Sequence, residues 1–189
     1  MKVGVLALQG DFREHVRVLS AAGAVPIEVR TAAELTDVDR LVIPGGESTT
    51  IAKLAIAGDL VGPIGERVRD GMPILGTCAG MIVIAERVID GDPLLSLMDV
   101  TVRRNAYGRQ VESFEADVDV DGFDHPVRGV FIRAPWIEDV GADVRVLSSY
   151  EGRPVEGIEI TTNPYARDGK PVFLQMGAHH AREWPSAEH

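Results

Sequence analysis

Short apolar runs alternate with amphipathic stretches along the first half of the chain. Runs typical of buried strands lie at residues 3–8, 26–29, 41–43 and 73–77. Apolar residues at helical spacing between these runs predict helices at 12–22, 49–57, 61–69 and 79–88. Fully apolar strands that alternate with helices are typical of a parallel sheet covered on both faces. We therefore expect an α/β fold, a three-layer sandwich around a central, mostly parallel sheet.

The pattern changes after about residue 100. Strand-like segments follow one another at 100–103, 113–120, 130–133 and 144–148, with turns and no helical pattern between them. This succession predicts an antiparallel extension of the sheet. Near the C-terminus, the turn signal Asp168-Gly169 separates two apolar segments and predicts a hairpin of 155–161 with 171–176 in an atypical C-terminal end.

Two of the expected helices begin at residues that commonly cap helices. Asp11 is the candidate N-cap of the first helix, and Ser48 is that of the helix at 49–57. The apolar face of the first helix consists of Phe12, Val16, Leu19 and Ala22. His15 lies on the same helix, and we expect it on the surface or facing a partner, without a catalytic role.

The segment Gly76-Thr77-Cys78-Ala79-Gly80 has the G-x-nucleophile-x-G form of a nucleophile elbow between a strand and a helix. Such a turn is so tight that it needs small residues two positions before and two positions after the nucleophile. The amides at the start of the following helix favour a thiolate over a thiol. The alternative is a buried structural cysteine, but the glycine spacing favours a nucleophilic Cys78.

A second turn that contains glycines, Pro44-Gly45-Gly46-Glu47-Ser48-Thr49-Thr50, follows another expected strand. Its glycines let the backbone approach a ligand closely. The N–H groups of Gly45 and Gly46 could form one half of an oxyanion hole, and the N–H of Ala79 the other half. Alone, this segment also fits an ordinary turn into a capped helix. Both turns lie at strand ends, where open α/β sheets bind ligands.

Composition narrows the classes of function. Of 189 residues, 45% are hydrophobic and one is a cysteine, and the formal net charge is −10. An acidic surface repels phosphate backbones, so we expect no nucleic-acid partner. A single cysteine excludes an internal disulfide framework. No apolar stretch approaches the ~20 residues that cross a bilayer, and we expect no membrane segment.

In its motifs the chain resembles the glutaminase subunits of pyridoxal 5′-phosphate synthase, which are class I glutamine amidotransferases. The resemblance extends from residue 2 to about residue 150. The segments that carry it are 4–10 with Glu14-His15, 44–50, 76–80, 103–114 and 130–135.

This resemblance implies hydrolysis of L-glutamine to L-glutamate and ammonia, with Cys78 as the nucleophile. It implies that the ammonia passes to a synthase subunit for vitamin B6 biosynthesis, in a mixed complex in the cytoplasm. No metal or organic cofactor is expected. The positions that match the family's glutamine-binding residues are Gly46, Glu47, Ser48, Arg104, Ile132 and Arg133. Without the family, the two arginines would be interpreted as solvated charges at strand ends.

A cysteine amidase also needs a histidine base and a carboxylate that orients this histidine. The family supplies both from a Phe-His-Pro-Glu segment near its C-terminus, and this sequence has no such tetrapeptide. His125, in Phe123-Asp-His-Pro126, is expected in a surface turn between strands. The missing pair must therefore come from elsewhere, or the chain is inactive.

Residues from about 150 onward resemble a fragment of a zinc carboxypeptidase, in which His180 and Glu183 would be two zinc ligands. Zinc catalysis requires three protein ligands and an open position, so two ligands predict neither a metal site nor a peptidase. One hypothesis is that this tail replaces the missing pair, with His180 or His179 as the base and Glu183 or Glu188 as its partner. The alternative is a loosely packed tail without catalytic residues.

We therefore divide the chain into a glutamine amidotransferase domain at 1–150, incomplete at its C-terminal end, and an atypical tail at 151–189. The expected function is that of the glutaminase subunit. The first alternative is a catalytically dead subunit that only docks on the synthase. The others are a chimeric chain that does not fold stably and a metal-binding tail.

Overall fold

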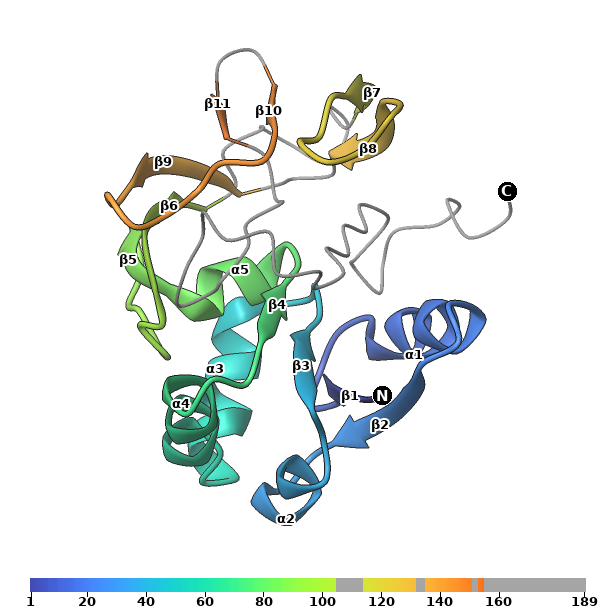
Figure 1. Cartoon of the computed structure of the whole chain (residues 1–189). Helices are drawn as coiled ribbons and strands as arrows, with labels where there is room; N and C mark the ends of the chain where they lie inside the picture. The colour runs from blue at the N-terminus through green and yellow to red at the C-terminus, as the bar shows by residue number, and fades with distance from the viewer. Residues whose placement is uncertain (105–113, 132–134, 151–152, 155–189) are drawn as a thin grey trace.

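The computed structural model describes residues 1–104, 114–131, 135–150 and 153–154. Four parallel strands form the central sheet, in the order β2-β1-β3-β4 (Figure 1). These strands are β1 (Lys2–Leu6), β2 (Val25–Val29), β3 (Arg40–Ile43) and β4 (Ile74–Gly76). They confirm the four strands expected from the apolar runs, with slightly different limits.

Helices cover both faces of this sheet, because successive side chains of a strand point to opposite faces. On one face, Val3, Val5 and Val42 pack with Leu19 of α1 (Phe12–Ala21). On the other face, Leu6, Leu41 and Ile43 belong to a larger core with the remaining helices. These are α2 (Ala32–Thr36), α3 (Ser48–Ala57), α4 (Val61–Arg69) and α5 (Ala79–Ile84). Figure 1 shows α1 on the opposite side of β1 and β3 from α3 and α4, which confirms the three-layer α/β fold.

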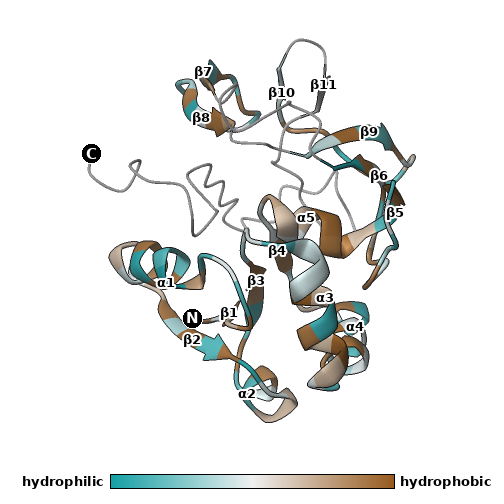
Figure 2. Cartoon of the chain, turned by 180° about the vertical axis from the view of Figure 1, so that it is seen from behind, coloured by the Kyte–Doolittle hydropathy of each residue, from teal (hydrophilic) through white to brown (hydrophobic). Residues whose placement is uncertain are grey.

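Strand β3 is hydrophobic on both faces, as expected for an internal strand of a parallel sheet (Figure 2). Leu41, Val42 and Ile43 are buried, and Ile43 is completely inaccessible. Helix α2 was not expected from the apolar pattern, because it is short and its start depends on local hydrogen bonds. Glu34 N donates to Thr31 Oγ1 while the Glu34 carboxylate accepts from Thr31 N, which forms a capping box.

The second half contains smaller sheets. Strands β5 (Ala85–Ile89), β6 (Met98–Arg103) and β9 (Trp136–Val140) form one sheet, parallel between β5 and β6 and antiparallel between β6 and β9. Strands β7 (Phe114–Val118) and β8 (Val127–Phe131) form an antiparallel pair, as do β10 (Ser149–Tyr150) and β11 (Arg153–Pro154). The strands expected at 100–103, 113–120 and 130–133 are therefore present as β6, β7 and β8, with different limits. Within the described residues, the strands of these smaller sheets pair with one another and not with β4. The exposed His125 lies in the turn between β7 and β8, as predicted.

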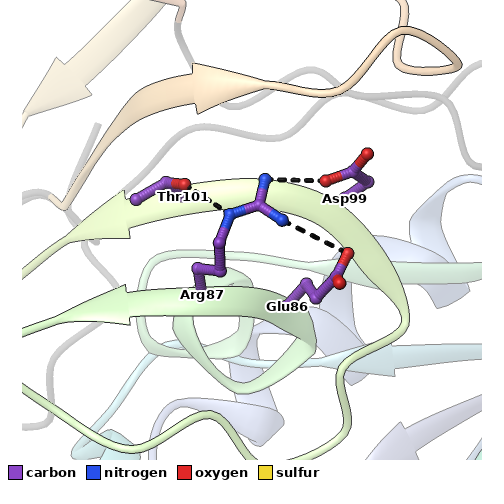
Figure 3. Close-up of polar contacts among 4 residues, drawn as sticks. All are labelled: Glu86, Arg87, Asp99 and Thr101. Atoms are coloured by element: carbon purple, nitrogen blue, oxygen red, sulfur yellow. Dashed lines mark hydrogen bonds and ion pairs between the residues drawn. The ribbon is translucent and has the colours of Figure 1, made fainter.

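The helix expected at 79–88 is too long, because α5 ends at Ile84 and the chain continues as β5. The β5–β6 pairing takes precedence over the helical pattern, and Figure 3 shows the cross-strand contacts. Arg87 Nε donates to Thr101 Oγ1 at 2.8 Å, and Arg87 Nη2 donates to Asp99 Oδ1 at 2.7 Å. The Glu86 carboxylate lies 3.5 Å from Arg87 Nη1.

The prediction of a strand at 144–148 is also wrong. The strand in this region is β9, which ends before Gly141. Gly141 N donates to Asp99 O, and Val144 N donates back to Gly141 O, so the chain turns at this point. Ser148 makes an isolated bridge with Val120. The hairpin expected at 155–161 and 171–176 lies outside the described residues.

No helix in the described part of the chain has the length and apolar character needed to cross a membrane.

Candidate functional site

The candidate site lies where β1, β3 and β4 end. The chain moves from β1 to β2 on one side and then to β3 on the other side of β1, so the strand order reverses between β1 and β3. In open α/β sheets, ligands bind at such a point, beyond the carboxyl ends of the strands. The turns that carry Gln9, Gly46 and Cys78 follow these three strands and therefore meet at one edge of the sheet.

Cys78 occupies a strained turn between β4 and α5. Its φ of 48° and ψ of −106° place a non-glycine residue at positive φ, which costs on the order of 1–3 kcal/mol. A Cβ atom at Gly80 would lie 2.0 Å from the carbonyl oxygen of Ile43, and one at Gly76 would lie 2.6 Å from the backbone of Gly80. The two glycines are required because the backbone approaches itself so closely. The tight turn expected from the glycine spacing is therefore confirmed.

Helix α5 starts directly after Cys78, which is its N-cap residue. Gly80 N donates to Thr77 O at 2.8 Å, and Met81 N donates to Cys78 O at 3.1 Å. Ala79 is the first residue of the helix, where amide groups have no intrahelical acceptor. The turn thus places Cys78 directly before the free amide of Ala79, at the carboxyl end of β4.

The turn after β3 is held by the turn after β1. Glu47 N donates to Gln9 Oε1 at 2.8 Å, and Asp11 N donates to Gly45 O at 3.1 Å. Gly46 has a φ of 152°, and a Cβ atom there would lie 2.6 Å from Gln9 Oε1. The shape of the Gly45–Gly46 turn thus depends on Gln9, a role that the sequence pattern did not indicate.

Ser48 was expected to cap α3, and this expectation is wrong. Glu47 is the N-cap residue, with extended backbone angles, and Ser48 is the first residue of the helix and is buried. A side-chain cap requires the extended conformation that Glu47 has here.

Asp11 is the N-cap of α1 as predicted, but its side chain makes no capping hydrogen bond. Burial is the main cause that raises the pKa of Asp11, and Glu14 raises it further.

Arg104, which follows β6, reaches the turn after β3. Its Nη2 lies 3.8 Å from Glu47 Oε1, and the Arg104 side chain is partly buried. The structure therefore brings together two residues that the sequence placed far apart, both of them predicted to bind glutamine. Gly46, Ser48 and Ala79 lie at the same edge of the sheet.

His15 corrects a prediction, because it is buried and not on the surface. Only 2% of His15 is exposed, and its ring lies between two backbone turns of the site. His15 Nε2 is 3.1 Å from Thr77 Oγ1, and Nδ1 is 3.0 Å from the carbonyl oxygen of Asp11. His15 lies one helical turn before the buried Leu19, so its position on the buried stripe could have been predicted. Its polar character led to the wrong expectation.

Burial lowers the pKa of His15, although the hydrogen bond to Asp11 and the charges of Asp11 and Glu14 oppose this effect. The folded protein therefore binds a proton at His15 less readily than the unfolded chain does. As the pH falls through 6.5, the ordinary value, the unfolded state gains the proton first and stability decreases.

We therefore expect the free energy of unfolding to decrease between pH 7.5 and 5.5 more steeply in the wild type than in His15→Gln, which cannot titrate there. Denaturant unfolding at each pH measures the two slopes. His125→Gln, at an exposed histidine, is the matched control and should keep the wild-type slope. Equal slopes in the wild type and His15→Gln would contradict the expectation.

The remaining predicted site residues lie outside the described part of the chain: Ile132, Arg133, His179, His180, Glu183 and Glu188. Within the described residues, no three side chains of histidine, cysteine, aspartate or glutamate gather as a metal ion would require.

Comparison with known proteins identifies the family to which this chain is similar. Residues 5–164 match the SNO glutamine amidotransferase family, and residues 143–189 match the zinc carboxypeptidase family. The pyridoxal 5′-phosphate synthase subunit PdxT of Streptomyces coelicolor is 56% identical over 157 residues, which are 81% of this chain and 78% of that protein. The corresponding subunit of a Parafrankia species is 58% identical over 158 residues, which are 82% of this chain and 78% of that protein.

Solved structures agree with this assignment. The crystal structure of a glutamine amidotransferase superposes with a TM-score of 0.77 and 46% identity, covering 81% of this chain and 82% of that one. The structure of PurLQS from Thermotoga maritima shares the fold, with a TM-score of 0.62 at 18% identity, covering 79% of this chain and 74% of that one. The family match over residues 5–164 and these relatives, together with the elbow at Cys78 and the parallel sheet, show that this chain belongs to the SNO glutamine amidotransferase family.

Proposed function

We propose that this chain is the glutaminase subunit of a pyridoxal 5′-phosphate synthase. It hydrolyses L-glutamine to L-glutamate and ammonia, and the ammonia passes to the synthase subunit. The observation that carries the proposal is the strained elbow at Cys78, since this geometry presents a side chain at the start of a helix. The glutamine amidotransferase family supplies the substrate, and the names of the relatives, which are 56% and 58% identical, supply the complex.

In the proposed reaction, the Cys78 thiolate attacks the side-chain amide carbon of glutamine. The amide oxygen becomes an oxyanion, which the N–H groups of Gly46 and Ala79 stabilise. The C–N bond then breaks, a protonated base gives its proton to the nitrogen, and ammonia leaves a glutamyl thioester on Cys78. Water then gives a proton to the base and attacks the thioester carbon, and the C–S bond breaks. This step releases glutamate and restores the Cys78 thiolate and the protonated base.

Glutamine is proposed to contact Gly46, Glu47, Ser48, Arg104, Ile132 and Arg133. The ion pair between Arg104 and Glu47 supports this set, because it places one positive and one negative charge beside the turn after β3. These charges suit the carboxylate and the ammonium group of an amino acid. His180 as the base and Glu183 as its partner complete the proposal, in the tail at 151–189 that follows the domain at 1–150.

The second candidate is a subunit that docks on the synthase without hydrolysing glutamine. Two observations favour it: the sequence has no Phe-His-Pro-Glu segment, and residues 143–189 match the zinc carboxypeptidase family. Loss of a catalytic histidine alone can cost on the order of 10⁶ in turnover. Both candidates place the protein in the same complex, in the cytoplasm.

Ammonia release from glutamine, measured with and without the synthase subunit, separates the two candidates. For the active glutaminase we expect release above the Cys78→Ala blank, increased by the synthase subunit, and lost in His180→Ala. Copurification with the synthase subunit without ammonia release would instead establish the docking subunit. Release that is unchanged in His180→Ala would remove His180 from the mechanism and leave the rest of the proposal intact.

A further inference from the structure

We propose that His15 is a positioning residue for Cys78, acting through the hydroxyl group of Thr77. In this proposal His15 acts through the Thr77 hydroxyl and not on the reacting atoms, so it is a positioning residue and not a catalytic residue. The inference rests on the proposed function in one respect, because it takes Cys78 as the nucleophile whose geometry matters.

The two hydrogen bonds of the His15 ring indicate which of its nitrogen atoms carries the proton. The carbonyl oxygen of Asp11 can only accept a hydrogen bond, so His15 Nδ1, 3.0 Å away, carries the proton and donates. In a neutral imidazole, Nε2 is then the acceptor, and the Thr77 hydroxyl donates to it across 3.1 Å. The resulting chain runs from the Asp11 carbonyl through the His15 ring to Thr77, the residue directly before Cys78.

Burial supports a neutral ring. His15 and Thr77 are each 2% exposed, so water does not compete for this hydrogen bond. The charged groups that act on His15 are Asp11 and Glu14, and their effect is smaller than that of burial, which lowers the pKa of His15. A hydrogen bond between buried groups is costly to lose, because each group that stays unpaired keeps its desolvation penalty.

The same turn also holds the predicted glutamine-binding segment. Gln9 accepts from Glu47 N, and Asp11 N donates to Gly45 O, within a few residues of the Asp11 carbonyl that fixes His15. The turn after β1 therefore contacts both halves of the site: directly at Gly45 and Glu47, and through His15 at Thr77. This arrangement explains why a buried histidine at this position would affect chemistry as well as stability.

The elbow needs this support because it is strained. Cys78 has positive φ, and its orientation depends on the peptide that joins it to Thr77. When the Thr77 side chain is released, Cys78 can relax toward ordinary backbone angles and move its sulfur away from the start of α5. The thiolate then loses interaction with the helix amides, and the reactivity of Cys78 falls.

The test measures alkylation of Cys78 by iodoacetamide, which needs neither glutamine nor the synthase subunit. Cys78 is the single cysteine, so the reaction reports on this site alone. Thr77→Val removes the hydroxyl but keeps the shape of the side chain, whereas Thr77→Ser keeps the hydroxyl. We expect Thr77→Val to slow alkylation about three- to tenfold, the range of one lost hydrogen bond, and Thr77→Ser to retain the wild-type rate. The pH profile of the reaction should shift to higher pH in Thr77→Val.

Ser148→Ala is the matched control, since it also removes a buried hydroxyl. The Ser148 hydroxyl donates to the backbone carbonyl of Asp119 at 2.7 Å and not to His15. We expect it to lower thermal stability while leaving alkylation unchanged. His15→Gln, whose amide can reach Thr77 in place of Nε2, should react faster than His15→Ala. If the histidine variants do not fold, the comparison of Thr77→Val with Thr77→Ser alone tests the proposal.

A wild-type alkylation rate in folded Thr77→Val, with only a lower Tm, would overturn the proposal and leave His15 a purely structural residue. Equal decreases of the alkylation rate in Thr77→Val and Thr77→Ser would also overturn the proposal, because loss of the hydroxyl would then not explain the slower reaction. Absence of ammonia release from glutamine would refute the active glutaminase without changing these alkylation rates, so the two failures are distinguishable.

Discussion

Cys78→Ala is expected to reduce ammonia release from glutamine by a factor on the order of 10⁴ to 10⁶ in the complex with the synthase subunit. The reason is that the proposed thioester cannot form without the thiol, and removal of a catalytic nucleophile has effects of this size. The measurement is ammonia release from glutamine by the wild type and the variant, each saturated with synthase subunit.

Cys78→Gly separates this chemical effect from folding. It should be as inactive as Cys78→Ala, but more stable by about 1 kcal/mol, because glycine adopts a φ of 48° without strain. Denaturant unfolding of the two variants measures the difference. If both variants keep the wild-type rate of ammonia release, the nucleophile is not Cys78. If Cys78→Gly is the less stable of the two, the elbow does not store strain.

Gly80→Ala is expected to destabilise the fold by about 3 kcal/mol or more, one of the largest effects available in this chain. The new Cβ atom would lie 2.0 Å from the carbonyl oxygen of Ile43, a backbone atom of a buried strand that cannot move aside. Either α5 moves away from β3 or the elbow opens, and both changes displace Cys78. Urea unfolding measures the loss of stability, and iodoacetamide alkylation measures the displacement.

Gly62→Ala is the matched control for this substitution. Gly62 lies in α4 at an exposed position, and a Cβ atom there would contact nothing within 4 Å. Gly62 precedes Pro63, whose ring opposes the helix preference of alanine at this position, so this variant should change stability by no more than about 1 kcal/mol. A loss of stability in Gly80→Ala no larger than about 0.5 kcal/mol would mean that the close packing of α5 against β3 is not a requirement of the fold.

Residues whose function follows from backbone geometry could be predicted from the sequence. The glycines at 76 and 80 indicate a turn that is too tight for side chains, and the structure has this turn around Cys78. The apolar runs indicate the four parallel strands, because a strand buried on both faces has to be apolar throughout. The family motifs added the predicted glutamine-binding residues, of which Glu47 and Arg104 lie close together.

Residues whose role depends on a distant partner could not be predicted in this way. The periodic pattern extended α5 to residue 88, but pairing of Arg87 with Thr101 on β6 ends the helix at Ile84. The helical spacing of His15 before Leu19 could have indicated burial, but nothing local indicates that Thr77, 62 positions away, is its partner. Gln9 likewise gains its role only from the turn after β3.

The sequence by itself determined the layers of the fold and the position of the nucleophile elbow, since both depend on the short-range spacing of apolar residues and glycines. It also indicated the family, through the resemblance of motifs such as those at 44–50 and 76–80. Only the tertiary structure decided that the turn after β1 joins the other two turns at the sheet edge, that His15 packs against Thr77, and that β5 replaces the end of a helix. These features depend on contacts between residues far apart in the chain. Their free energy comes from burial and hydrogen bonds that exist only after the sheet has assembled.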